Sequence, residues 1–87
     1  MKVLLKSELF PNPNEGNFTL RFRVPLEKQS VEITIFDLSG RVILKENRKL
    51  ETANELYFKN NLLNGTYLVK VNLPDGTYDL HRLIISK

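Results

Sequence analysis

The chain has 87 residues, no cysteine and a net charge of +3. Its length corresponds to one domain, in which only roughly 60–65% of the surface of the unfolded chain becomes buried. The absence of cysteine excludes disulfides, thiolate metal sites and a cysteine nucleophile. Acidic residues interrupt the basic ones almost everywhere, so we expect a solvated surface and no nucleic-acid patch.

The N-terminal residues begin like a signal peptide but do not complete one. Lys6 ends the apolar run that starts at Val3 after three residues, whereas a signal peptide needs about 7–15. No stretch reaches the ~18 apolar residues of a membrane-spanning helix. We therefore expect neither an export signal at this N-terminus nor membrane insertion.

The first third of the chain predicts two strands joined by a polar loop. Val3–Phe10 predicts an irregular strand, and the loop that follows runs from Pro11 to Gly16. Its oxygen-bearing residues could suggest a calcium site, but their spacing matches no EF-hand loop, and we expect a structural turn instead. These residues are Asn12, Asn14 and Glu15. Asn17–Val24 then alternates apolar and polar residues, as a half-buried strand does, with Phe18, Leu20, Phe22 and Val24 inward and Thr19, Arg21 and Arg23 outward.

The segment Val31–Leu44 predicts a β-hairpin, and we expect the other strands to add to it. Val31, Ile33 and Ile35 alternate with polar residues, and their branched side chains favour a pleated sheet. In the turn Asp37-Leu38-Ser39-Gly40, the carboxylate can accept backbone N–H groups, and glycine tolerates a positive φ. The return strand begins at Arg41.

The second half of the chain predicts three further strands. Glu46–Ala53 could extend the return strand, and Glu55–Lys59 predicts a short edge strand. Asn64-Gly65 is a turn signal before the strand Thr66–Leu73, whose inward residues are Tyr67, Val69, Val71 and Leu73. Pro74 and Gly76 predict a type I turn, as Asp37 and Gly40 do in the first hairpin, after which Thr77–Ser86 returns.

About seven short strands without helical periodicity predict an all-β fold, an antiparallel immunoglobulin- or fibronectin-like β-sandwich. A five-stranded OB-type barrel is the alternative. The strand count favours the sandwich, because the barrel uses fewer strands.

The residue types do not point to catalysis or to a cofactor. His81 is the only histidine, which argues against multi-histidine metal sites and most catalytic triads, and we expect it on a surface face of its strand. Ser39 lacks a neighbouring base, and Asp37 is explained by its turn. Asp75 and Asp79 flank a hairpin without a sign that they converge. We expect that the protein is not an enzyme.

Three segments, in this order and spacing, resemble one family. They are Pro11-Asn12-Pro13 with Gly16, the hairpin Val31–Val42 with its Gly40-Arg41 pair, and Leu63–Val71 followed by the terminal Leu83–Lys87. Each segment alone is also ordinary hairpin chemistry. Together they resemble the type A C-terminal sorting domain of the type IX secretion system (Por secretion system) of Bacteroidetes.

The resemblance implies a non-catalytic domain at the C-terminus of a larger exported protein. It implies two partners, the outer-membrane translocon, which recognises the domain, and a cell-surface sortase, which removes it. The cargo would enter the periplasm through its own signal peptide and end at the cell surface or outside the cell. Since this chain begins at Met1 without cargo, we expect residues 1–87 to be a single domain excised from such a protein.

The recognition signal is expected to include exposed and terminal residues of the three segments. The same residues have structural interpretations, since the glycines set turns and Ile84 or Ile85 fills the core. The candidate sorting residues are Pro11, Asn12, Pro13, Gly16, Asp37, Gly40, Arg41, Gly65, Tyr67, Lys70, Ile84, Ile85 and Lys87.

Two other functions remain open at this point. The first is a spacer, or an adhesive or carbohydrate-binding module, which would display aromatic side chains. Its candidates are Tyr57, Tyr67 and Tyr78, and we expect core or rim packing for each. The second is a small nucleic-acid-binding barrel, suggested only by the pI of about 9.3.

Overall fold

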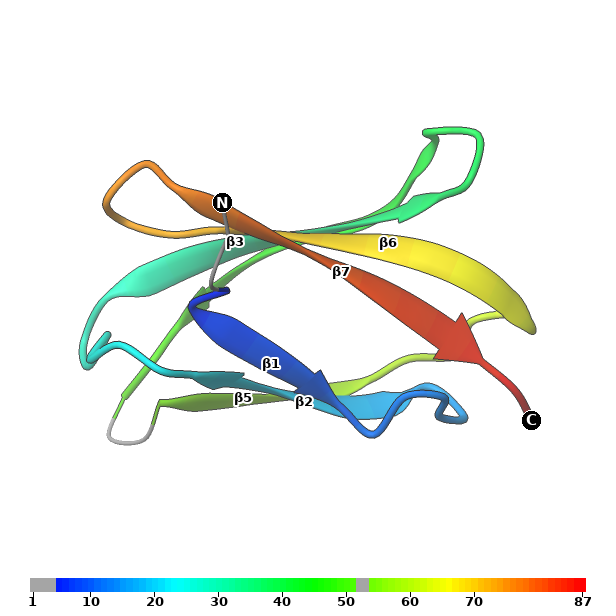
Figure 1. Cartoon of the computed structure of the whole chain (residues 1–87), viewed down its shortest axis with the longest axis horizontal. Coiled ribbons are helices and arrows are strands. Elements are labelled where there is room, and N and C mark those ends of the chain that lie inside the picture. The colour runs from blue at the N-terminus through cyan, green and yellow to red at the C-terminus, as the bar shows by residue number, and fades with distance from the viewer. Residues whose placement is uncertain (1–4, 52–53) are drawn as a thin grey trace.

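The computed structural model describes residues 5–51 and 54–87, which form seven β-strands. The strands are β1 (Ser7–Phe10), β2 (Asn17–Phe22), β3 (Ser30–Asp37), β4 (Val42–Lys49), β5 (Glu55–Lys59), β6 (Gly65–Asn72) and β7 (Tyr78–Ile85). They build two layers, with β1, β2 and β5 in one and the remaining strands in the other (Figure 1). The predicted all-β sandwich is confirmed.

Every strand pairs antiparallel to its neighbours. The three-stranded sheet has the order β1-β2-β5, and the four-stranded sheet has the order β4-β3-β6-β7. In an immunoglobulin constant domain the fourth strand pairs with the fifth, whereas here β4 pairs with β3. The sandwich therefore has its fourth strand in the larger sheet.

The hairpin predicted over Val31–Leu44 forms, but it does not organise all other strands. β3 is central in its sheet, where it pairs with β4 and β6, while β4 is an edge strand. The strands β1, β2 and β5 form a separate sheet that packs across the core, so the expectation that they add to the hairpin is wrong. Hydrophobic periodicity shows which face of a strand is buried, and it does not show which sheet the strand joins.

Alternating residues of both sheets fill the core. Leu20 of β2, Ile33 and Ile35 of β3 and Val69 of β6 are fully buried, and the outer residues between them are polar or half-exposed. Burying such a side chain contributes about 1.5–3 kcal/mol. The rings of Phe18 and Phe58 stack at a centroid distance of 4.9 Å within the three-stranded sheet.

Strand boundaries agree with the sequence-based expectation to within a few residues. β2 ends at Phe22, two residues before Val24, and β4 ends at Lys49. β5 is an edge strand, as expected. The proposed contributions of Val3, Leu4, Thr52 and Ala53 to strands lie outside the described residues.

Candidate functional site

The three motif segments meet at one end of the sandwich. In the four-stranded sheet, Asp37 at the end of β3 pairs with Tyr67 of β6, and Gly65 at the start of β6 pairs with Ile85 at the end of β7. The β3–β4 turn, the start of β6, the loop before β2 and the C-terminus all lie on the right of Figure 1. We call this the motif end.

Two asparagines of the first loop hold the last strand. Asn12 Nδ2 donates to the carbonyl oxygen of Arg82 at 2.6 Å, and Asn12 Oδ1 accepts the N–H of Ile84 at 2.9 Å. The backbone of Asn14 forms a parallel bridge with Ile85, since its N–H donates to the Ile84 carbonyl and its carbonyl accepts the N–H of Ser86. These amides are engaged within the chain, in agreement with a structural turn and not a calcium loop.

The first loop also fixes its own turn and the strand beside it. Asn14 Nδ2 donates to the Pro11 carbonyl, and Asn14 Oδ1 accepts the N–H of Gly16 at 2.8 Å. Gly16 has φ +121°, and a Cβ there would lie 2.1 Å from the carbonyl oxygen of Asn60. Only glycine combines this backbone conformation with so close an approach.

A second loop, which leads into β6, holds the residues after β7. Asn64 Oδ1 accepts the N–H of Lys87 at 3.0 Å, and Asn61 Oδ1 accepts its Nζ at 3.2 Å. Tyr67 is buried and donates its hydroxyl to the Leu63 carbonyl at 2.6 Å. The tail Ile84–Lys87 is therefore held between two asparagine-containing loops that are far apart in sequence.

The turn between β3 and β4 has the hydrogen bonds that the sequence predicts. Gly40 N–H donates to the Asp37 carbonyl, and Asp37 Oδ1 accepts the N–H groups of Ser39 and Arg41 at 3.0 and 2.9 Å. These bonds, led by the one from the Ser39 hydroxyl, lower the pKa of Asp37 below its usual range. Arg41 Nε lies 3.1 Å from Asp37 Oδ2, yet 77% of the Arg41 side chain is exposed. Asp37 therefore shapes the turn, and Arg41 is presented to solvent beside Leu38.

The structure brings most candidate sorting residues together, with one exception. Lys70 lies in the middle of β6, paired with Thr34 and Leu80, and its ammonium group sits 4.5 Å from the centre of the Tyr78 ring. It belongs to the outer face of the four-stranded sheet and not to the motif end. Sequence reasoning also missed Asn61, whose only signal was its place in an asparagine-rich turn.

His81 is buried, and the expectation that it lies on a surface face is wrong. In β7 buried and exposed positions alternate from the start, but the first two buried positions hold the polar residues Asp79 and His81, while Tyr78 and Leu80 are exposed. Across the sandwich, Ser7 of β1 donates its hydroxyl to Asp79 Oδ2 at 2.5 Å and lies 2.8 Å from His81 Nε2. The polar residues are tolerated inside because they satisfy one another.

This serine, histidine and aspartate do not form a nucleophilic triad. The Ser7 proton is directed to Asp79, so the remaining bond requires His81 Nε2–H to donate to Ser7 Oγ, the reverse of base activation. Burial, with the nearby charge of Arg23, lowers the pKa of His81 below 6.5 although Asp79 opposes the shift. Ser7 is 1% exposed. The cluster joins β1 to β7 and offers no access to a substrate.

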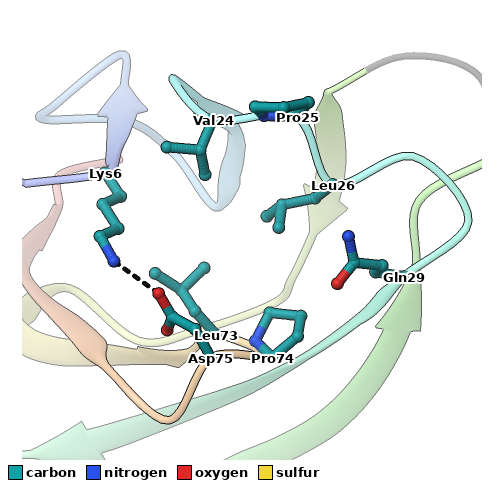
Figure 2. Close-up of a pocket in the computed structure, with 8 residues that line it drawn as sticks. All are labelled: Lys6, Val24, Pro25, Leu26, Gln29, Leu73, Pro74 and Asp75. Atoms are coloured by element: carbon teal, nitrogen blue, oxygen red, sulfur yellow. Dashed lines mark hydrogen bonds and ion pairs between the residues drawn. The ribbon is translucent and has the colours of Figure 1, made fainter.

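A small pocket lies at the opposite end of the sandwich from the motif end. Its walls include Leu26 and Leu73, its volume is about 220 Å³, and an ion pair between Lys6 Nζ and Asp75 Oδ2 at 2.6 Å lies at its rim (Figure 2). Ligand pockets usually measure about 300–1,000 Å³ and contain several converging polar groups. This pocket has mainly apolar walls and one ion pair, so it gives little support to a small-molecule site.

Two tyrosines are more exposed than expected. Tyr67 is packed in the core, as predicted, but Tyr57 and Tyr78 are 69% and 58% exposed, so the prediction of core or rim packing is wrong for both.

Among residues 5–51 and 54–87, no group of three or more His, Asp or Glu side chains could hold a metal ion. In the same part of the chain, no helix is long and apolar enough to cross a membrane.

The fold and the motif end together define a small β-sandwich domain in which the loop before β2 and the loop before β6 hold the last strand and the tail that follows it. The chain belongs to the family described as secretion system C-terminal sorting domain, which it matches over residues 8–86. The type IX resemblance read from the three segments is thereby confirmed. A domain of this family marks the protein that carries it for secretion or for the cell surface.

A solved structure shows a similar domain within a much longer chain. The crystal structure of dimeric latent PorU from Porphyromonas gingivalis matches with a TM-score of 0.67 and 26% sequence identity. The match covers 91% of the present chain but 9% of that one. No curated protein shows significant similarity to this chain.

Proposed function

We propose that this domain directs a cargo protein, joined to its N-terminal side, across the outer membrane through the type IX translocon. A cell-surface sortase then acts on it, and the cargo reaches the surface or the medium by way of the periplasm of a member of the Bacteroidetes. In this proposal, residues 1–87 are a single sorting domain excised from a larger exported protein, and the domain has no catalytic role. The observation that supports this best is the convergence of three sequence-distant motif segments at one end of the fold.

We further propose that the machinery recognises the folded motif end and not an extended tail. Leu83 and Ile85 are core residues at 0% and 2% exposure, and the backbone between them is bonded to Asn12 and Asn14. Reading these residues as a linear peptide would require unfolding the last strand. The exposed groups available at this end are those of the β3–β4 turn, above all Arg41 and Leu38.

A fusion experiment tests the function. The domain is attached to the C-terminus of a fluorescent protein that bears a signal peptide, and the fusion is expressed in a Bacteroidetes host with an intact type IX system and in a secretion-deficient mutant. We expect fluorescence outside the cell only in the first strain. Periplasmic retention in both strains, with the domain folded, would instead support a passive spacer module.

Deletion of residues 83–87 is a poor test of recognition, because it removes core side chains. The substitution Arg41→Ser changes an exposed side chain. It leaves in place the hydrogen bonds that the backbone N–H groups of Ser39 and Arg41 donate to the Asp37 carboxylate. We expect the Arg41→Ser fusion to fold and to be exported less. Unchanged export would exclude Arg41 from the recognised surface.

A further inference from the structure

The outer face of the four-stranded sheet carries an exposed apolar stripe. Phe36 of β3 lies in register between Val42 of β4 and Leu68 of β6, and Leu80 and Tyr78 continue the apolar surface on β7. Val42, Leu80 and Tyr78 are 52%, 47% and 58% exposed. Neighbouring apolar side chains exposed to this extent on a small domain commonly mark an interaction surface.

The same face carries the excess positive charge of the protein. Its outward residues include four basic side chains and one acidic side chain, Glu32, which leaves +3 and equals the net charge of the whole chain. The basic residues are Lys45, Lys49, Lys70 and Arg82. Within the described chain, Lys70 and Arg82 form no ion pair, and Lys45 lies 3.9 Å from Glu32.

The outer face of the three-stranded sheet is different. There Arg21 lies between two carboxylates, 3.8 Å from Glu8 and 3.7 Å from Glu55. Its guanidinium also covers the ring of Phe10 at 4.8 Å. On the strands of this face two basic residues, Arg21 and Lys59, balance two carboxylates, and both carboxylates lie beside Arg21. Such an arrangement is common on a surface that faces only solvent.

We infer that the outer face of the four-stranded sheet, defined by Phe36, Leu68, Lys70, Tyr78, Leu80 and Arg82, docks onto a protein surface of the secretion machinery that presents acidic side chains around apolar ones. The inference rests on the proposed function and names the chemistry of the partner. Unpaired basic groups gain from facing acidic side chains, and the apolar stripe between them is removed from water in the same contact. Lys70, which lies away from the motif end, belongs to this surface.

A protein partner fits this face better than a membrane or a second copy. An amphipathic helix that binds a membrane buries its apolar face about 5–10 Å into the headgroup region, whereas Phe36 and Leu68 lie half-buried in a sheet. Two copies face to face would oppose two surfaces of the same charge, which is unfavourable. An acidic protein surface complements the positive charge of this face and can cover its half-buried apolar side chains without their insertion into a membrane.

The size of the face predicts a reversible contact. Four strands of eight residues each span about 26 Å by about 19 Å at the usual rise and spacing of β-strands. The resulting area of about 500 Å² is below the ~800 Å² per partner of a stable complex and falls in the transient class. A sorting domain that must leave its receptor needs such a contact.

Two matched double variants of the fluorescent fusion test the inference. Tyr78→Ser with Arg82→Glu alters the four-stranded sheet, and Tyr57→Ser with Lys59→Glu makes the same kind of change on the outer face of β5. Both tyrosines are exposed, and both basic residues are exposed. We expect about tenfold lower export for the first variant and less than about twofold change for the second, since like charges at a contact are strongly unfavourable.

Folding and partner class are measured alongside. Circular dichroism and urea unfolding of the purified variants check the fold. If the Tyr78/Arg82 double variant unfolds, Arg82→Glu alone replaces it. The conservative variant Arg82→Lys, which keeps the positive charge, should be exported as well as the parent fusion. Equal export of the two double variants overturns the docking face alone, while no export of the parent fusion overturns the proposed function as well. Binding of the parent domain to vesicles of phosphatidylglycerol and phosphatidylcholine, lost in the Tyr78/Arg82 variant, would assign the face to a membrane and overturn a protein partner.

Discussion

The two ends of the sandwich are held by different chemistry. At the motif end, asparagine amides and backbone groups hold the last strand, and none of these groups titrates. At the opposite end, ionisable groups hold the residues that lead into β1. Lys6 forms an ion pair with Asp75, and the Ser7 hydroxyl is hydrogen-bonded to Asp79 and His81. Between pH 5 and 8, pH and salt should therefore act on the bonds at the opposite end and leave the bonds that hold the last strand unchanged. The following experiments test this difference, from the largest expected effect to the smallest.

Gly16→Ala should have the largest effect. The substitution forces a non-glycine residue to φ +121° and places a Cβ 2.1 Å from the Asn60 carbonyl oxygen, so we expect a loss of about 3 kcal/mol or more in the free energy of unfolding, measured in urea. Gly76→Ala, at the opposite end, is the matched control. It has φ +89° but nothing within 4 Å of the new Cβ, so only about 1 kcal/mol of backbone strain is expected. Equal losses would show that crowding at Gly16 is unimportant.

Asn14→Ala should lower stability by about 2 kcal/mol, because the buried N–H of Gly16 loses its acceptor. Asn61→Ala serves as the control, since it removes one exposed bond to the Lys87 side chain and should cost less than about 0.5 kcal/mol. Urea unfolding at two pH values measures both. A loss at Asn14 that varied with pH between 5 and 8 would contradict the conclusion that the bonds holding the last strand do not titrate.

The His81 cluster should make the opposite end sensitive to acid. Because burial holds the native pKa of His81 below 6.5, the unfolded state takes up a proton that the folded state does not as the pH falls through 6.5. The free energy of unfolding should therefore decrease from pH 8 to pH 5. His81 is the only histidine, and His81→Gln should remove most of this slope. A slope that persisted in His81→Gln would assign the acid sensitivity to another group.

Lys6→Gln should have the smallest effect. The ion pair between Lys6 and Asp75 is exposed, and such pairs contribute little to stability. Hydrogen bonds from Lys6 and Thr77 nevertheless hold the pKa of Asp75 well below its usual value. We expect a smaller change in the urea midpoint than for Asn61→Ala, and no difference from the parent in 1 M salt, where the Debye length is about 3 Å. A difference that survived high salt would mean that the Lys6 side chain acts by packing.

Local sequence chemistry predicted the hairpin and its turn, and it failed where distant segments meet. The roles of Asp37 and Gly40 in the turn could be predicted, because the hydrogen bonds of this turn join residues at most four positions apart. The burial of His81 could not be predicted in this way. A polar residue is stable in the core only beside a polar partner, and the sequence does not show that Ser7 of the other sheet lies next to His81. The same holds for Asn12, which reads as a loop residue until β7 is placed beside it.

The bonds from Asn12 also determine when the domain can finish folding. They join residues 70 and 72 positions apart in the chain, and contacts between such distant residues form late, since a long loop must close first. The first loop stays open until the last strand has left the ribosome or a translocation channel. A chain that is still emerging, or one cut short before Ile84, therefore lacks the native motif end, and any receptor that recognises that end would bind only completed chains.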